Sequence, residues 1–291
     1  MDLRGGGVKG LTSLLLVSIL WGTSFPAIKT VMMSVNEYTY TWVRSLIAIT
    51  GLTPYLIYVY RNGRLSVQSI KGGTMAGVAY ALGLWLQGWG TKYTTASNSA
   101  FITGLSVVFV HMYTGVIRGR YSYKMGVTLA LSLLGLYMLT TPTSGFNVGD
   151  LLVLLGSFMW AAQIILVSRY CSSDPLVFTL FEMVPALMFI FPDVMFYGYV
   201  GIDFNSLLII AYLAIVCSDA AFALQVFGQR FIDPAVAAVI FLLEPVAASV
   251  FSYILLKEVM GLHQLMGALL ILISMSIAST DKSMLMDVKE K

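Results

Sequence analysis

Charged residues are scarce in this chain. Asp, Glu, Lys and Arg make up 11% of its 291 residues, whereas a soluble domain carries about 25%. Hydrophobic residues make up 58%, and the mean hydropathy is +0.85. A soluble core of this size does not absorb so much apolar surface, so we expect lipid to surround most of the chain. The net charge of +3 is small and dispersed, which argues against a nucleic-acid partner.

Cysteine and histidine are equally rare. Cys171 and Cys217 fall in different segments, so neither a disulfide nor a metal pair is expected. His111 and His263 are the two histidines, and the sequence contains no H-E-x-x-H, G-x-S-x-G or P-loop motif. We therefore predict that the protein is not an enzyme and has no cofactor, no metal site and no catalytic residue.

Long apolar runs dominate what is present. At about 20 residues per crossing, the sequence predicts ten membrane helices, near 10–33, 38–60, 72–90, 94–117, 123–141, 149–169, 175–198, 204–229, 233–256 and 261–280. The first run lacks an A-x-A cleavage site, so it is interpreted as a retained helix and not a signal peptide. The expected fold class is an all-α polytopic membrane protein.

The distribution of basic residues predicts the orientation. With the N-terminus inside, three basic residues (Lys29, Lys92 and Lys257) face outward and Arg44 lies within a helix. Thirteen lie on the cytoplasmic side: Arg4, Lys9, Arg61, Arg64, Lys71, Arg118, Arg120, Lys124, Arg169, Arg230, Lys282, Lys289 and Lys291. This bias predicts cytoplasmic N- and C-termini in the cell (inner) membrane.

The two halves of the chain resemble each other. Adding 138 to a position maps LQGWGTKY, which starts at Leu86, onto LQVFGQRF, which starts at Leu224. The same offset maps Pro54 onto Pro192. We therefore predict two five-helix repeats, 1–145 and 146–291. Because five is odd, the second repeat is expected to be inverted, which places a solute site near the midplane where the halves meet.

Glu244 and Pro245 lie at the centre of an apolar run from Asp233 to Lys257. A charge there costs roughly 2.5–3.5 kcal/mol on insertion scales. Pro245 provides no N–H for the carbonyl of Phe241, so the helix is expected to bend and Pro245 to act as a structural hinge. Such a bend is typical of a solute pathway, and the alternative is a kinked packing helix.

Several motifs stand out by their order and spacing: Leu20 to Phe25, Trp42 to Arg44, Thr94 to Val110, Gly149 to Ala161, and LEPVAA with Lys257-Glu258 and Gly267. Together they resemble the drug/metabolite transporter superfamily, in its EamA-like branch of ten-helix permeases. The chain departs from the family pattern at His111, where many relatives carry proline, and at Asp219, where many carry a small or apolar residue. The resemblance implies a secondary transporter that works by alternating access.

Polar and aromatic side chains inside these helices are the candidates for contact with a solute. The predicted substrate-binding residues are Trp21, Phe25, Arg44, Trp85, Asn98, Thr103, His111, Trp160, Gln163 and Glu244. Arg44 suits a carboxylate, because a guanidinium offers two parallel hydrogen bonds. Trp21 and Phe25 are four residues apart and share a helix face. For several of these residues, ordinary helix packing or capping remains the alternative.

Three acids are candidates for proton coupling or gating, namely Glu182, Asp219 and Glu244. Glu182 is the repeat counterpart of Arg44 and a candidate ion-pair partner. Asp219 maps onto Ala81 and has no acidic counterpart, and an acid inside the membrane is a functional candidate by default.

The leading hypothesis is an exporter of small amphipathic metabolites, such as hydrophobic or aromatic amino acids. An exporter of cationic lipophilic drugs is the first alternative. An intramembrane enzyme that uses Glu244, Asp219 and His111 as acid–base groups is the alternative of another class. The expected partners are a small-molecule solute and the lipid bilayer, with a homo-oligomer left open.

Overall fold

The computed structural model describes residues 3–117, 119, 122–140, 147–198, 201–256 and 261–280. The helices of the first half are α1 (Leu3–Gly22), α2 (Ser24–Val31), α3 (Glu37–Arg61), α4 (Val67–Tyr93), α5 (Ala96–Gly104), α6 (Ser106–Met112), the π-helix η1 (Tyr113–Ile117) and α7 (Tyr123–Thr140). Those of the second half are α8 (Val148–Tyr170), α9 (Pro175–Met183), the 3₁₀-helix η2 (Val184–Phe189), α10 (Ile190–Phe196), α11 (Phe204–Tyr212), the π-helix η3 (Leu213–Ala220), α12 (Ala221–Gly228), α13 (Pro234–Phe241), α14 (Leu243–Leu256) and α15 (Leu262–Thr280).

The chain is an all-α membrane protein, as predicted. Seven helices of the described residues are long and apolar enough to cross a membrane. Joined end to end, the helices above form ten segments that match the ten predicted runs. The three segments beyond those seven are α4, whose 27 residues include six glycines, and the shorter apolar α7 and α15.

Side-chain caps explain where several segments begin. Asn36 accepts hydrogen bonds from the backbone N–H groups of Tyr38 and Thr39 at the start of α3, as expected of an N-cap. At the start of α8, Asn147 and Asp150 form a capping box. The cap itself is Asn147, and Asp150, three residues later, accepts the backbone N–H of Asn147 in return.

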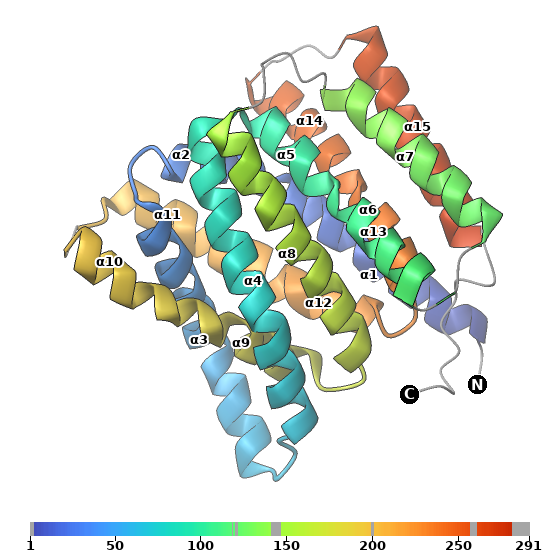
Figure 1. Cartoon of the computed structure of the whole chain (residues 1–291). Coiled ribbons are helices and arrows are strands. Elements are labelled where there is room, and N and C mark those ends of the chain that lie inside the picture. The colour runs from blue at the N-terminus through green and yellow to red at the C-terminus, as the bar shows by residue number, and fades with distance from the viewer. Residues whose placement is uncertain are drawn as a thin grey trace.

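Helices from the two halves pair along their lengths. In Figure 1, α4 runs beside α8, and α7 with α15 forms a pair at one edge of the molecule. Glycines let two of these pairs approach closely. A Cβ added at Gly90 of α4 would lie 2.6 Å from the carbonyl oxygen of Gly149 in α8, and one added at Gly10 of α1 would lie 3.1 Å from that of Gly228 in α12.

These two glycine pairs are equivalent by the internal repeat. Gly90 maps onto Gly228 with the offset of 138, and Gly10 maps onto Gly149 with one further residue. The first segment of each half therefore contacts the third segment of the other half: α1 contacts α12, and α8 contacts α4. This reciprocity gives the chain a two-repeat architecture.

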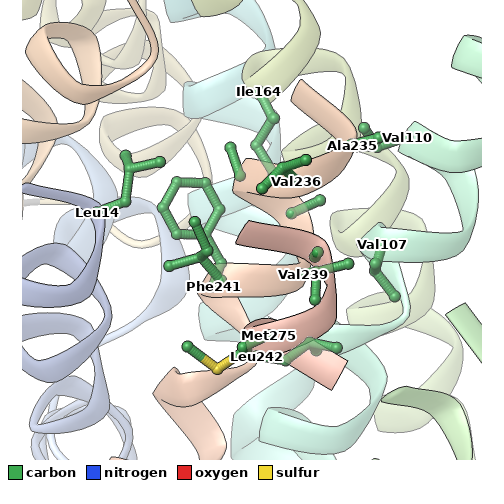
Figure 2. Packing of buried hydrophobic residues seen from close by; sticks show 14 of the residues in the cluster. Leu14, Val107, Val110, Ile164, Ala235, Val236, Val239, Phe241, Leu242 and Met275 are labelled. Atoms are coloured by element: carbon green, nitrogen blue, oxygen red, sulfur yellow. The ribbon is translucent and has the colours of Figure 1, made fainter. Parts of the chain in front are cut away.

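The largest hydrophobic cluster surrounds α13. Figure 2 shows Val236, Val239 and Phe241 of α13 among Leu14 of α1 and Val107 of α6. Every residue of α13 is buried, whereas one face of an ordinary membrane helix contacts lipid. A helix buried on all sides lies at the centre of its bundle, so the predicted pathway helix is central.

Some sequence predictions fall outside the described residues. These are the repeat boundary between 145 and 146, the Lys257-Glu258 pair, the loop arginines Arg118 and Arg120, and the C-terminal lysines beyond residue 280.

Candidate functional site

A cavity of about 60 Å³ lies between the two halves of the chain. Because about 10–15 Å³ of such volume holds one water molecule, the cavity is large enough to be hydrated. Residues from both halves line it: Trp21, Ser24, Ile28, Arg44, Leu84, Gln87, Ala100, Thr103, Gly104, Ser106, Trp160, Gln163, Ile164, Phe222, Ala238, Phe241, Leu242, Glu244 and Pro245.

Three interrupted helices meet at this cavity. The first segment breaks at Thr23 between α1 and α2, the fourth at Leu105 between α5 and α6, and the ninth at Leu242 between α13 and α14. The eighth segment is wound as the π-helix η3 just before Phe222. Irregular backbone at membrane depth is tolerated where it lines a cavity, and broken helices are typical of transporter binding sites.

The ninth segment is interrupted close to the predicted hinge. Pro245 deprives the carbonyl of Phe241 of its helical donor, and α13 ends at Phe241. The N–H of Leu242 instead donates to the carbonyl of Val239 at 3.1 Å. Ser18 of α1 donates its hydroxyl to the carbonyl of Ile240 at 3.1 Å. Together these contacts hold Glu244 and Pro245 on the cavity wall.

The breaks of the first and ninth segments touch each other at Gly22. A Cβ added there would lie 2.6 Å from Cβ of Ala247 and 2.9 Å from the carbonyl oxygen of Glu244. Real Cβ atoms essentially never come so close to another heavy atom, so only glycine fits without a shift. Gly22 therefore sets the distance between these two helices beside the cavity.

Arg44 lies on the cavity wall and is 3% exposed. Its Nε donates to the Ser218 hydroxyl at 2.9 Å, and its Nη1 donates to the Tyr40 hydroxyl at 2.6 Å. Within the described part of the chain, its Nη2 makes no hydrogen bond and the guanidinium forms no ion pair. The proposed Arg44–Glu182 pair is therefore not formed in this structure.

Glu182 is held instead by a chain of amides. It is fully buried, and its Oε1 accepts from Nε2 of Gln163 at 2.6 Å. Gln163 and Gln225 exchange two hydrogen bonds of 3.0 Å each, and Gln225 also donates to Gln229. Among the described residues, Oε2 of Glu182 has no hydrogen-bond partner. Gln163 thus connects the cavity wall to a buried acid behind it.

Asp219 lies in η3 and is outside the cavity lining. A Cβ added at Gly51 of α3 would lie 3.0 Å from Oδ2 of Asp219, so the carboxyl group packs against α3. Its Oδ1 is buried without a hydrogen-bond partner among the described residues. Ser218, the preceding residue, contacts Arg44.

Four aromatic rings form the apolar wall of the cavity. The ring of Trp21 lies 5.0 Å from that of Phe222 and 5.2 Å from that of Phe241. Trp160 lies 6.1 Å from Phe222 on the same wall. The indole N–H of Trp21 donates to the carbonyl of Cys217 within η3. That of Trp160 is buried and has no partner among the described residues.

Six of the ten predicted substrate-binding residues line the cavity. They are Trp21, Arg44, Thr103, Trp160, Gln163 and Glu244. Thr103 of α5 accepts a hydrogen bond from Gln87 of α4, which also lines the cavity. Sequence reasoning missed Ser24, Ser106, Phe222 and Phe241. The internal repeat could have identified Ser24. With the offset of 139 that relates Trp21 to Trp160, Ser24 maps onto Gln163, which was predicted to bind substrate.

Four predicted site residues lie elsewhere. Phe25 packs against Ala100 and Ala248, because the helix break at Thr23 separates its face from that of Trp21. Trp85 stacks on Tyr38 and packs against Phe189 with the two rings tilted.

Asn98 is buried near the start of α5, where Thr95 is the cap. His111 donates from Nδ1 to the carbonyl of Val107 one turn earlier. Neither residue is part of the cavity lining.

Comparison with known proteins identifies relatives over nearly the whole chain. The model of the EamA-like transporter family matches twice, at residues 8–141 and 147–280. A protein of Archaeoglobus fulgidus named "uncharacterized transporter" is 31% identical over 285 residues, which cover 95% of this chain and 89% of that protein. A second protein of the same name and organism is 24% identical over 263 residues, or 84% and 88% of the two chains.

A solved crystal structure shares the architecture. It is 15% identical, has a TM-score of 0.75, and covers 95% of this chain and 98% of that chain. At this identity the likeness shows the fold alone.

Proposed function

Since the chain belongs to the EamA-like transporter family, we propose that it is a secondary transporter that exports small amphipathic metabolites, such as hydrophobic or aromatic amino acids. Transport proceeds by alternating access between two inverted repeats. A small-molecule solute and the bilayer are its partners. The relatives are named transporters, which points away from an enzyme.

One observation carries the choice of solute. The cavity presents groups of opposite charge, Arg44 and Glu244, beside a wall of four aromatic rings. A zwitterionic amino acid has a carboxylate for Arg44 and an ammonium group for Glu244. Its apolar side chain gains from burial against the rings, while its charged ends need defined partners. Glu244 has no hydrogen-bond partner within the described residues, and Nη2 of Arg44 is equally available.

The proposed orientation follows the distribution of basic residues. Both termini are cytoplasmic, and the start of α3 lies at the outer face of the cell membrane. A chain with five helices per repeat then inserts its second half upside down. The reciprocal glycine contacts of Gly10 with Gly228 and of Gly90 with Gly149 support a pseudo-two-fold axis between the halves, as in inverted-repeat transporters.

A cationic lipophilic drug is the second candidate. Two of the five N–H donors of Arg44, one on Nε and one on Nη1, are already bonded to Ser218 and Tyr40, which leaves fewer donors for a carboxylate. Glu244 carries no such constraint, and the indole rings of Trp21 and Trp160 offer faces for a cation. These contacts favour a positively charged solute.

Flux in liposomes that contain only the purified protein distinguishes the two candidates. If an amino-acid carboxylate binds Arg44, Arg44→Ala abolishes the flux of radiolabelled phenylalanine, whereas a quaternary amine moves as well or better. Movement of the amine also shows that the variant is folded. Arg64→Ala, on an exposed loop, is the control for loss of a positive charge.

Undiminished phenylalanine flux in Arg44→Ala removes Arg44 from the site and favours the drug. Absence of flux for any solute in the wild-type protein contradicts the transporter proposal itself.

A further inference from the structure

Helix α3 packs against the segment formed by α9, η2 and α10. Side-chain hydrogen bonds join the two near both ends of their contact. One contact involves Asp193 near the start of α3, and the other involves Asp174 near its end. Each joins the first half of the chain to the second. Neither belongs to the cavity described above.

The contact at Asp193 is buried and has several donors. Oδ1 of Asp193 accepts from Nδ2 of Asn36 at 2.9 Å. Oδ2 accepts from the Thr39 hydroxyl and from the indole N–H of Trp42, each at 2.6 Å. Asp193 is 5% exposed. Three hydrogen bonds to a carboxylate are charge-assisted and therefore strong.

The contact at Asp174 is simpler. The Tyr55 hydroxyl donates to Oδ2 of Asp174 at 2.8 Å. Oδ1 of Asp174 accepts the backbone N–H groups of Leu176 and Val177 as the N-cap of α9. Both Tyr55 and Asp174 are partly exposed. Asp174 accepts a hydrogen bond from one side chain of α3, whereas Asp193 accepts hydrogen bonds from three side chains. The contact at Asp174 is therefore the weaker of the two.

The internal repeat relates the two contacts. With the offset of 138, Asn36 maps onto Asp174, and each of these residues is the N-cap of its helix. Tyr55 maps onto Asp193, and each directly follows a proline, Pro54 or Pro192. The pair Asn36–Asp193 therefore corresponds to the pair Asp174–Tyr55, with the two halves of the chain exchanged. We call these two contacts latches: the Asp193 latch, made with Asn36, Thr39 and Trp42, and the Asp174 latch, made with Tyr55. They lie at equivalent positions of the two repeats, near opposite ends of α3.

The latches lie on either side of the cavity. Arg44, which lines the cavity, lies between Asn36 and Tyr55 on α3. At 1.5 Å per residue, the two ends are about 12 Å and 16 Å from it along the helix axis. A passage that followed α3 from the cavity to either face of the membrane would therefore pass one of the two aspartates.

We propose that Asp193 and Asp174 are gating residues, each of which closes one mouth of the transport pathway, and that the two latches open in alternation. This inference rests on the proposed function. In the proposed orientation, the Asp193 latch closes the outer mouth and the Asp174 latch closes the cytoplasmic mouth. The internal repeat explains why the two latches alternate. The movement of the two halves that opens the Asp193 latch is related by the pseudo-symmetry to the movement that opens the Asp174 latch.

Conservative variants break one latch at a time. Trp42→Phe keeps a ring but removes a donor to Asp193, and Tyr55→Phe does the same for Asp174. Trp89→Phe and Tyr58→Phe are the matched controls, because neither donor forms a hydrogen bond within the described residues.

The reporter is a single cysteine at Ser106 on the cavity wall, in a chain whose Cys171 and Cys217 are replaced by serine. Its rate of reaction with a membrane-impermeant thiol reagent is measured separately from each side of the membrane. Trp42→Phe is expected to raise the ratio of outer to cytoplasmic labelling about tenfold, and Tyr55→Phe to lower it about tenfold, as loss of a hydrogen bond to a charged group implies. The double variant is expected to return the ratio towards that of the wild type.

Opposite shifts are the signature of gating, because a variant that only loosened the fold would raise labelling from both sides. Shifts in the same direction, or ratios equal to those of the controls, overturn the proposal. Labelling from one side alone in every variant overturns it as well. The reporter needs no known solute, so the flux of the wild-type protein still decides the proposed function independently.

Discussion

Replacement of Gly22 by alanine tests whether the contact between the two broken helices controls the site. The added methyl group would lie 2.6 Å from Cβ of Ala247, whereas carbon atoms pack best at about 3.5–4.0 Å. The first and ninth segments would therefore have to separate by roughly 1 Å. Overpacking of this kind costs about 1–3 kcal/mol. Alanine recovers up to about 1 kcal/mol through its higher helix propensity.

The expected result is a loss of about 1–2 kcal/mol in the free energy of unfolding, measured by denaturation in mixed micelles. The carbonyl of Glu244 lies 2.9 Å from the same position, so solute flux should fall as well. Gly201→Ala is the control, because no heavy atom lies within 4 Å of a Cβ built there. Ala247→Gly should restore part of the lost stability in the double variant, and such a coupling is expected for residues in contact.

If Gly22→Ala is as stable as Gly201→Ala, the close approach of the two segments does not constrain the fold. If Gly22→Ala loses stability but Ala247→Gly restores none of it, the strain arises elsewhere. Either result would refute the explanation of Gly22 given above.

Three further predictions concern orientation, acids and a helix cap. A cysteine that replaces Asn62 should resist labelling by a membrane-impermeant reagent from outside intact cells, and efficient labelling would contradict cytoplasmic termini. The neighbouring Gly63 is left unchanged because its φ of +64° favours glycine. Solute flux should depend on pH, and Glu244→Gln or Asp219→Asn should flatten that dependence; if neither does, the carrier is uncoupled and these acids are structural. Hydrogen bonds from Ser206 hold the pKa of the exposed Asp203 carboxyl below its usual range. This cap therefore stabilises α11 above the unfolded-state pKa of Asp203 and is lost as pH falls through the lower folded-state pKa. The protection factor of the Ser206 amide, which is the intrinsic exchange rate divided by the observed rate, should fall at acid pH in the wild type, and Asp203→Asn, an equally good cap, should abolish that fall.

The ten helical segments were predictable because lipid imposes a simple rule on sequence. Apolar runs must reach about 20 residues, and the joints between them carry breakers or charges. Asp174-Pro175 shows how a joint is encoded, since the aspartate caps the helix that the proline begins. Helix α4 departs from the rule because its glycines lower its hydropathy while allowing close approach to α8, and α7 and α15 depart from it because they are shorter.

The interruptions were predictable only where proline marks them. Pro245 indicated the break near Leu242, and its cause is local. The break at Thr23 is marked in the same way, because Pro26 follows it by three residues as Pro245 follows Leu242, but this signal was overlooked. The break at Leu105 has Val108 at that position, so no proline marks it. Phe25 was assigned to the cavity because a continuous helix was assumed through Thr23. The partners of Arg44 were hidden for a similar reason, because Ser218 lies 174 residues away.

Arg44 is bonded to two hydroxyl groups and not to a carboxylate, although Glu182 and Asp219 lie on neighbouring segments. A buried charge without an opposite charge is costly, and such a cost is rarely retained for stability alone. An internal ion pair would have satisfied the guanidinium and left nothing for a solute. Ser218 and Tyr40 hold the guanidinium in place, and neither of them carries a compensating negative charge. Entry of a carboxylate would then supply the missing charge, and the free energy of that pairing is available to bind solute inside the membrane.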